Sequence, residues 1–223
     1  MENHRKLLLN LSKINAGKTL LHKEAFSIEK FFHDLEGVLA FSFAKRELQD
    51  RMLRLCLLRH MDTAWALPGQ KDIERLLNDS GNEDLQIVRK WIKDRALTPG
   101  HVFCSPAART RQTLEGLMPA FEGEPDISFV DDLYTGFVGE YLDCIVNHDA
   151  AEPLMIIGHN PTCASLANLL AAEGDSEALS TVSYTYPTGA LAIIDFDISN
   201  WSELKEGTGT LIDFLMPRPS SRY

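Results

Sequence analysis

Cysteine is scarce in this sequence, and the few cysteines do not form the short-range pairs of a disulfide framework or a zinc ribbon. The chain has four, which stand singly within apolar or motif segments with no Cys-x-x-Cys pair. This usage indicates a reducing compartment, and so a cytoplasmic protein, without a cysteine zinc site. We interpret them as small buried hydrophobes, with a redox-sensitive thiol as the alternative for the two nearest the motifs below. The four are Cys56, Cys104, Cys144 and Cys163.

Long apolar runs are also absent. No stretch approaches the roughly 18 to 20 apolar residues that cross a bilayer, so we expect a soluble protein without a membrane partner. Residues 4–11 resemble a targeting segment, but Asn10 interrupts the apolar part and no small-residue cleavage pattern follows. We therefore do not favour export or import into an organelle.

Positive charge is sparse beyond residue 51. Residues 1–51 hold 9 Lys/Arg and 7 Asp/Glu, whereas residues 52–223 hold 13 and 25, giving net charges of +2 and −12. Nucleic-acid binding depends on cations that neutralise phosphates, so we exclude nucleic acid as a partner. An anionic substrate would need a local cluster of cations to overcome the net negative charge of these residues. The candidate cations are Arg59, Arg75 and Arg109.

The change of charge near Met52 indicates the domain organisation. We expect a helical N-terminal extension over residues 1–51, a main domain over 52–219 and a short tail over 220–223. Apolar residues recur at helical spacing between Ser27 and Met52, which predicts one helix. Such a helix needs a partner, either the main domain or a second copy of the chain, so a homodimer through it is one expectation. An alternative is that Met52 is the true start.

Beyond Met52, short apolar runs alternate with amphipathic patterns. This alternation predicts an α/β fold, a three-layer sandwich with a mostly parallel central sheet flanked by helices. The predicted strands are residues 53–58, 101–104, 127–130, 154–157, 190–196 and 210–216, and the predicted helices lie around 85–92 and over 106–117, 138–148 and 162–172.

Four polar segments follow these predicted strands. Two of them place His60 and His159 directly after an apolar run, and the others carry Arg75 and Arg109. The carboxyl ends of neighbouring parallel strands meet at one edge of a sheet, which is where open α/β sheets place their chemistry. We therefore expect one pocket with two histidines and several arginines. The segments are residues 59–62, 72–76, 105–113 and 158–161.

Such a set of side chains is suited to a phosphoryl group. The guanidinium fork matches phosphate oxygens and stays charged at any working pH. A neutral imidazole can attack phosphorus, while a second one donates a hydrogen bond to the oxygens. Alignment and charge neutralisation then supply most of the catalysis. No metal and no cofactor is required.

The order of these motifs resembles the histidine phosphatase superfamily, which is also called phosphoglycerate-mutase-like. Within it, the segment Asp72-x-x-Arg75-Leu76 and the compact length are similar to phosphohistidine phosphatases of the SixA type. The resemblance covers about residues 52–219. It rests on Leu57-Leu58-Arg59-His60, on Ser105-Pro106 followed by Arg109 and Gln112-Thr113, on Gly158-His159-Asn160-Pro161, and on Pro187-Thr188-Gly189-Ala190.

The resemblance implies a role for each matched residue. His60 would be the nucleophile that becomes phosphorylated, and His159 would complete the phosphate cradle. Arg59 and Arg109 would hold the phosphoryl oxygens, and Arg75 matches the extra arginine of the SixA type. Ser105 and Asn160 would lie at the edge of the pocket and position their neighbours.

The sequence departs from the family pattern in two ways. Met61 stands where the family usually has glycine, and it could narrow the pocket or displace the backbone that approaches the phosphate. No single carboxylate is marked as the proton donor, and Asp62 and Glu140 are the two candidates. We expect Asp72 to cap a turn or pair with Arg75 rather than transfer a proton.

These observations lead to one main hypothesis and two alternatives. We expect a metal-independent phosphatase that works through a phosphohistidine on His60, with a phosphohistidine protein or a small phosphate ester as substrate. The alternatives are a catalytically impaired phosphate-binding module and a phosphomutase for small metabolites. The remaining histidines have no motif context and are expected to be structural or superficial. These structural or surface histidines are His4, His22, His33, His101 and His148.

Overall fold

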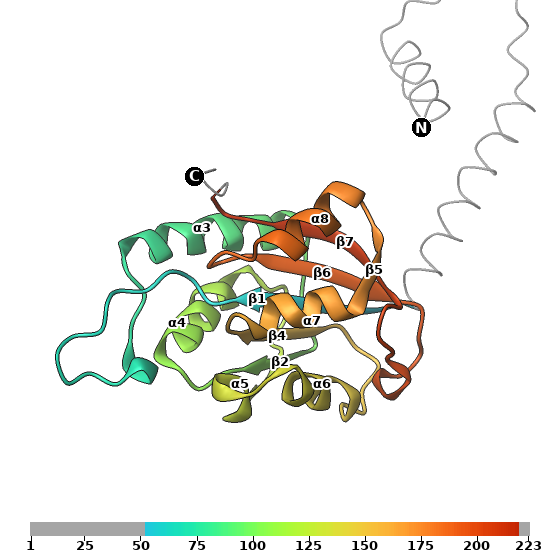
Figure 1. The fold of residues 1–223 in the computed structure, drawn as a ribbon, viewed down its shortest axis with the longest axis horizontal. Coiled ribbons are helices and arrows are strands. Elements are labelled where there is room, and N and C mark those ends of the chain that lie inside the picture. Colours follow the sequence, from blue (N-terminus) through green and yellow to red (C-terminus); the bar gives the residue numbers. More distant parts are fainter. Residues whose placement is uncertain (1–51, 219–223) are drawn as a thin grey trace, which may run out of the picture. The chain divides into compact units, whose positions relative to one another are not determined.

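The computed structural model describes residues 52–218. Their centre is a seven-stranded sheet in the order β3-β2-β4-β1-β6-β7-β5 (Figure 1). The helix predicted before Met52, the dimer expected through it and the tail at 220–223 lie outside these residues. The strands are β1 (Leu53–Arg59), β2 (His101–Cys104), β3 (Asp126–Phe129), β4 (Leu154–Gly158), β5 (Ala171–Gly174), β6 (Leu191–Phe196) and β7 (Gly209–Leu215).

The central strands owe their position to continuous apolar runs. All five residues of β4 and all six of β6 are buried, as are most of β1, which is typical of strands covered by helices on both faces. β1 pairs in parallel with β4, and β2 in parallel with both β4 and β3. β6 runs antiparallel to β1 and to β7. The prediction of a mostly parallel sheet is confirmed, with its antiparallel part on one side of β1.

Helices cover both faces of the sheet, so the three-layer sandwich is confirmed. One hydrophobic core joins the sheet to α6, α7 and α8, and the other joins it to α3 and α4. Fully buried Tyr141 and Trp201 belong to the first core, and Met61 and Leu117 to the second. The α-helices are α3 (Asp79–Asp94), α4 (Ala108–Leu117), α5 (Asp132–Thr135), α6 (Val138–Val146), α7 (Thr162–Leu170) and α8 (Ser176–Tyr184).

The sequence-based expectation fails between residues 171 and 184. The helix predicted over 162–172 ends at Leu170, and Ala171–Gly174 forms β5, which pairs with β7 at the edge of the sheet. Small and acidic side chains, mostly exposed, give this strand no apolar pattern. Its formation is a tertiary effect, because β7 offers an edge to pair with. Helix α8 follows, with Asp175 as its N-cap.

The topology brings the ends of three strands together. His60 follows β1, Ser105 follows β2 and His159 follows β4. Arg59 is in register with Gly158, and Cys104 with Ile157. Because β4 lies between β2 and β1, His159 stands between Ser105 and His60. Within residues 52–218, no helix is long and apolar enough to cross a membrane.

Candidate active site

The backbone of His60 is fixed from two sides. Its N–H donates to the carbonyl oxygen of Gly158 at the end of β4, at 3.1 Å, and its carbonyl oxygen accepts from the N–H of Gly189, at 3.0 Å. Gly189 has a φ of +74°, and a Cβ there would lie 2.9 Å from the Met61 sulfur, so the turn requires glycine. The backbone of His60 is therefore held on one side by the end of β4 and on the other by the turn before β6.

The imidazole of His60 has a defined tautomer. Its Nδ1 lies 2.7 Å from the carbonyl oxygen of Met61. A carbonyl only accepts, so Nδ1 carries the proton and Nε2 keeps its lone pair. Burial lowers the pKa of His60 to about 3, and the charges of Arg109 and Arg59 act in the same direction. The ring is therefore a neutral base at neutral pH.

Met61 does not narrow the pocket. Its side chain is fully buried in the core formed by the sheet, α3 and α4, and its backbone N–H donates to the Thr113 hydroxyl at 3.2 Å. The side chain therefore fills the core behind His60. The departure from glycine at this position is therefore accommodated in the hydrophobic core.

His159 lies beside His60, with ring centroids 5.1 Å apart. Its Nδ1 faces Nη2 of Arg109 at 3.4 Å, and its Nε2 lies 2.8 Å from the Ser105 hydroxyl oxygen. A guanidinium only donates, so Nδ1 accepts and Nε2 carries the proton. The backbone N–H of His159 donates to the hydroxyl of buried Tyr141 at 3.1 Å. Burial lowers the pKa of His159 to about 3, with smaller effects of His60 and Arg109.

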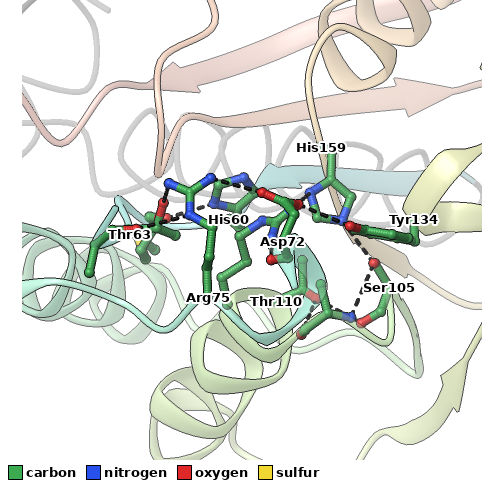
Figure 2. A network of polar contacts seen from close by, with 12 residues as sticks. His60, Thr63, Asp72, Arg75, Ser105, Thr110, Tyr134 and His159 are labelled. Carbon is green, nitrogen blue, oxygen red and sulfur yellow. Dashed lines mark hydrogen bonds and ion pairs between the residues drawn. The ribbon is translucent and has the colours of Figure 1, made fainter. Parts of the chain in front are cut away.

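Asp72 binds two of the three arginines of the pocket, Arg75 and Arg109 (Figure 2). Its Oδ2 accepts from Arg109 Nη2 and from the Tyr134 hydroxyl, both at 3.0 Å, and its Oδ1 accepts from Arg75 Nη1 at 2.9 Å. The carbonyl oxygen of Asp72 also accepts from Arg109 Nη1, at 2.8 Å. The bond from Arg75 lowers the pKa of Asp72 to about 2, with help from Tyr134 and Arg109. The predicted pairing with Arg75 is confirmed, and the carboxylate is ionised.

Arg59 and Asn160 are held by one backbone atom. The carbonyl oxygen of Tyr186 accepts from Arg59 Nη1 and from Asn160 Nδ2, each at 2.8 Å. Asn160 Oδ1 accepts from the N–H of Ala164 in the first turn of α7. Arg59 Nε is buried and has no hydrogen-bond partner among residues 52–218. Asn160 therefore positions the loop, while Arg59 keeps donors for another acceptor.

The two candidate proton donors have structural partners. Asp62 Oδ2 accepts from Asn78 Nδ2 at 2.9 Å. Glu140 Oε2 accepts from the backbone N–H of Phe137 at 2.8 Å and so caps the start of α6. The Asp62 carboxylate thus binds a side chain and the Glu140 carboxylate binds a backbone N–H, so each has a structural contact near its own loop.

The structure thus brings His60, His159, Arg109, Arg75 and Ser105 into one connected site, as predicted. Sequence reasoning missed three tyrosines that support it, because none belongs to a motif. Tyr134, which follows β3, could have been found from its place after a parallel strand. Tyr141 accepts a hydrogen bond from the backbone of His159, and the carbonyl oxygen of Tyr186 accepts from Arg59 and Asn160. No pattern in the sequence marks either tyrosine as part of the site. Cys104 and Cys163 are fully buried, and burial raises the pKa of each thiol to about 12, so both are inert hydrophobes.

The electrostatics of this site favour an anion over a cation. Three guanidiniums surround two neutral imidazoles, and Asp72 is the carboxylate that contacts Arg75 and Arg109. A metal cation beside the histidines would meet this positive charge. An oxyanion would accept from the same donors that now bind the carboxylate.

Comparisons with known proteins place this chain in a family. The model of the histidine phosphatase superfamily (branch 1) matches residues 55–134. The Agrobacterium tumefaciens protein named SixA is 33% identical, with a TM-score of 0.61 over 74% of this chain and 98% of that one. A SixA structure complexed with tungstate, 23% identical with a TM-score of 0.58 over 74% and 97% of the two chains, has the same fold. The phosphohistidine phosphatase SixA of Escherichia coli K12 is 28% identical over 67% of this chain and 92% of that protein.

The matched residues include His60, which follows β1, and helix α4, which carries Arg109. The match to the Agrobacterium protein covers 98% of that protein and 74% of this chain. The chain belongs to the histidine phosphatase superfamily, where its structural relatives are SixA-type proteins.

Proposed function

We propose that this protein is a phosphatase that hydrolyses its substrate through a phosphohistidine on Nε2 of His60. The observation that carries the proposal is the contact between His60 Nδ1 and the Met61 carbonyl oxygen, at 2.7 Å. It leaves Nε2 as an unprotonated nitrogen, and burial keeps the ring neutral. A neutral, oriented imidazole next to guanidiniums is what attack on a phosphoryl group requires.

The reaction takes two displacements. His60 Nε2 forms a bond to phosphorus as the bond to the leaving group breaks, and the phosphoryl charge is held by Arg59 and Arg109. Water then attacks phosphorus, the N–P bond breaks, and inorganic phosphate leaves with His60 neutral again. Attack and departure both occur in line, so most of the protein's contribution is alignment.

His159 acts on the phosphoryl oxygens after it gains a proton. Both its nitrogens have protein partners in this structure, of which the contact with Arg109 is the longer, at 3.4 Å. A bound phosphoryl group would draw Arg109 toward its oxygens and raise the pKa of the adjacent imidazole. Nδ1 would then carry a proton and donate to the phosphoryl group, while Ser105 continues to accept from Nε2.

The substrate that fits this site best is phosphohistidine on a partner protein. Asp62 and Glu140 already bind the local backbone and side chains, so neither is free to protonate an ester oxygen. The imidazole of a phosphohistidine leaves readily once its nitrogen takes a proton from water, and needs no such acid. A small phosphate ester is the second choice.

The test uses full-length protein without added metal or cofactor. Phosphoramidate, acetyl phosphate and an aryl phosphate are supplied to wild type, to His60→Ala and to His148→Gln, a histidine at the opposite edge of the sheet. We expect phosphate release by wild type and His148→Gln, with a preference for the phosphoramidate, and none above background by His60→Ala. Acid-labile, base-stable phosphate labelling should depend on His60.

Other outcomes point to the two alternatives. Wild type that releases phosphate no faster than His60→Ala, yet binds phosphate, would be a binding module. Transfer of the phosphoryl group to a second metabolite instead of water would indicate a phosphomutase. Labelling that persists in His60→Ala would remove His60 from its role.

A further inference from the structure

A second cluster of ligand side chains lies at the edge of the sheet opposite the phosphate pocket. It consists of His101, the first residue of β2, with His148 and Glu152 from the connection between α6 and β4. One nitrogen of each imidazole and one carboxylate oxygen all lie within 4.8 Å of one another. Because β2 runs from His101 to Cys104, about 10 Å of strand separates this cluster from the Ser105 end. The two sites are therefore distinct.

Glu152 is fixed through its backbone, and its carboxylate contacts His148. Its backbone carbonyl oxygen accepts from the indole N–H of buried Trp201 at 3.0 Å. Its side chain lies over Gly100, where a Cβ would stand 2.0 Å from Oε2. Glycine at this position makes room for the carboxyl group beside His101.

The two imidazoles are also fixed. Their ring centroids are 4.9 Å apart, and Phe103 packs against both, at 4.4 Å from His101 and 5.8 Å from His148. His101 Nε2 lies 3.0 Å from the Ser128 hydroxyl on β3, a contact of the kind that orients metal-binding histidines. The cluster is still open to water, because the side chains of His148 and Glu152 are 13% and 32% exposed.

The separations and charges suit a transition-metal cation. His148 Nε2 and Glu152 Oε1 are 2.9 Å apart, against roughly 3.3 Å between two ligand atoms on a tetrahedral zinc with bonds of about 2.0–2.1 Å. The acidic body of the protein attracts cations.

We infer that His101, His148 and Glu152 form a binding site for Zn²⁺ or a chemically similar divalent transition metal. Two imidazoles and one carboxylate match this class, whereas Mg²⁺ and Ca²⁺ prefer oxygen ligands. Three protein ligands leave a fourth position for water. The bound metal would join the start of β2 to the α6–β4 connection, and so stabilise the edge of the sheet away from the phosphate pocket.

A hydrogen-bonded pair of His148 and Glu152 accounts for those two residues without a metal. It does not involve His101, whose ring lies beside that of His148 with the two centroids 4.9 Å apart. The metal site explains why all three side chains converge. Metal titration distinguishes the two interpretations directly.

The test is calorimetric titration of ZnCl₂ into full-length protein freed of metal with a chelator, followed by thermal unfolding with and without one equivalent of Zn²⁺. We expect one saturable site and a higher Tm with Zn²⁺. His148→Gln and Glu152→Gln should each weaken Zn²⁺ binding at least about tenfold and abolish the rise in Tm. Both variants should keep the phosphatase activity of the metal-free protein.

Two controls identify the site. Asp149→Asn removes an exposed carboxylate next to the cluster and should leave Zn²⁺ binding unchanged. His60→Ala removes one of the two histidines of the phosphate pocket and should also leave Zn²⁺ binding unchanged. If Zn²⁺ binding and the rise in Tm persist in both cluster variants, or wild type binds no Zn²⁺, the proposed site is refuted. Loss of binding in His60→Ala alone would place the metal in the phosphate pocket and equally refute it.

Discussion

His60 Nδ1 donates a hydrogen bond to the carbonyl oxygen of Met61, the residue next to it in the chain, at 2.7 Å. The side chain of that same methionine is fully buried in the core beneath the site. Met61 thus orients the imidazole through its main chain and supports the loop through its side chain. These two contributions can be separated by mutation.

Met61→Ala should reduce stability much more than activity. Removal of a buried methionine side chain costs about 2–5 kcal/mol of unfolding free energy, while the carbonyl that orients His60 remains. Urea unfolding and kcat/KM at a temperature where the variant is folded would measure the two effects. Met61→Leu, which conserves volume, should cost less than about 1.5 kcal/mol. A large fall in kcat/KM with unchanged stability would show that the side chain shapes the pocket.

Asp72→Asn should strengthen product inhibition. The carboxylate occupies donors of Arg75 and Arg109 that a phosphate would use. Its neutral replacement competes less well for them. The inhibition constant for inorganic phosphate should fall at neutral pH. Asp131→Asn, an exposed carboxylate near β3, provides the matched control. Weaker inhibition in Asp72→Asn would mean that Asp72 aligns the arginines for phosphate instead of competing with it.

The arginines of the site should differ in importance. The Arg109 side chain is 8% exposed and contacts His159, whereas that of Arg75 is 24% exposed and lies on the loop before α3. We expect Arg109→Lys to lower kcat/KM about a hundredfold and Arg75→Lys about tenfold, because lysine lacks the bidentate fork. Arg111→Lys, exposed on the same helix α4, should change little. Unchanged kcat/KM in both Arg109→Lys and Arg75→Lys would mean that only the positive charge matters at these two positions.

Stability should fall as the pH drops below 6.5. The folded-state pKa values of His60 and His159 are lowered to about 3, whereas an unfolded histidine titrates near 6.5. Between these values the unfolded chain binds protons that the folded chain does not, so the free energy of unfolding decreases toward acid. Urea unfolding at several pH values measures this slope. It should be shallower in His60→Gln/His159→Gln, and an unchanged slope would contradict the lowered pKa values.

Much of this fold could be read from the sequence because its central strands are continuous apolar runs. The three catalytic segments follow those runs directly, so the parallel-sheet rule was enough to place His60, Ser105 and His159 together. The strand Ala171–Gly174 had no such pattern, since it forms through pairing with β7. The place of the Met61 side chain and the binding of Asp72 to Arg109 depend on three-dimensional packing between distant segments, which neither spacing nor composition reports.

The same limit applies to the second histidine pair. His101 and His148 had no motif context, because the ligands of the proposed metal site come from a strand start and a loop some fifty residues later. Their convergence with Glu152 depends on Gly100 and Trp201. The sequence-based expectation of a chain without a metal site stays untested until the titration is done.

The turn after α8 completes the backbone contacts of the site, although it lies late in the sequence. Residues 59–159 contain every side chain assigned to the reaction, yet the carbonyl oxygen of Tyr186 holds Arg59 and the N–H of Gly189 holds His60. A chain that ended at α7 would contain all of these side chains but would lack the contacts of Tyr186 with Arg59 and of Gly189 with the carbonyl oxygen of His60. The proposed active site is therefore complete only when the segment before β6 has packed against the ends of β1 and β4.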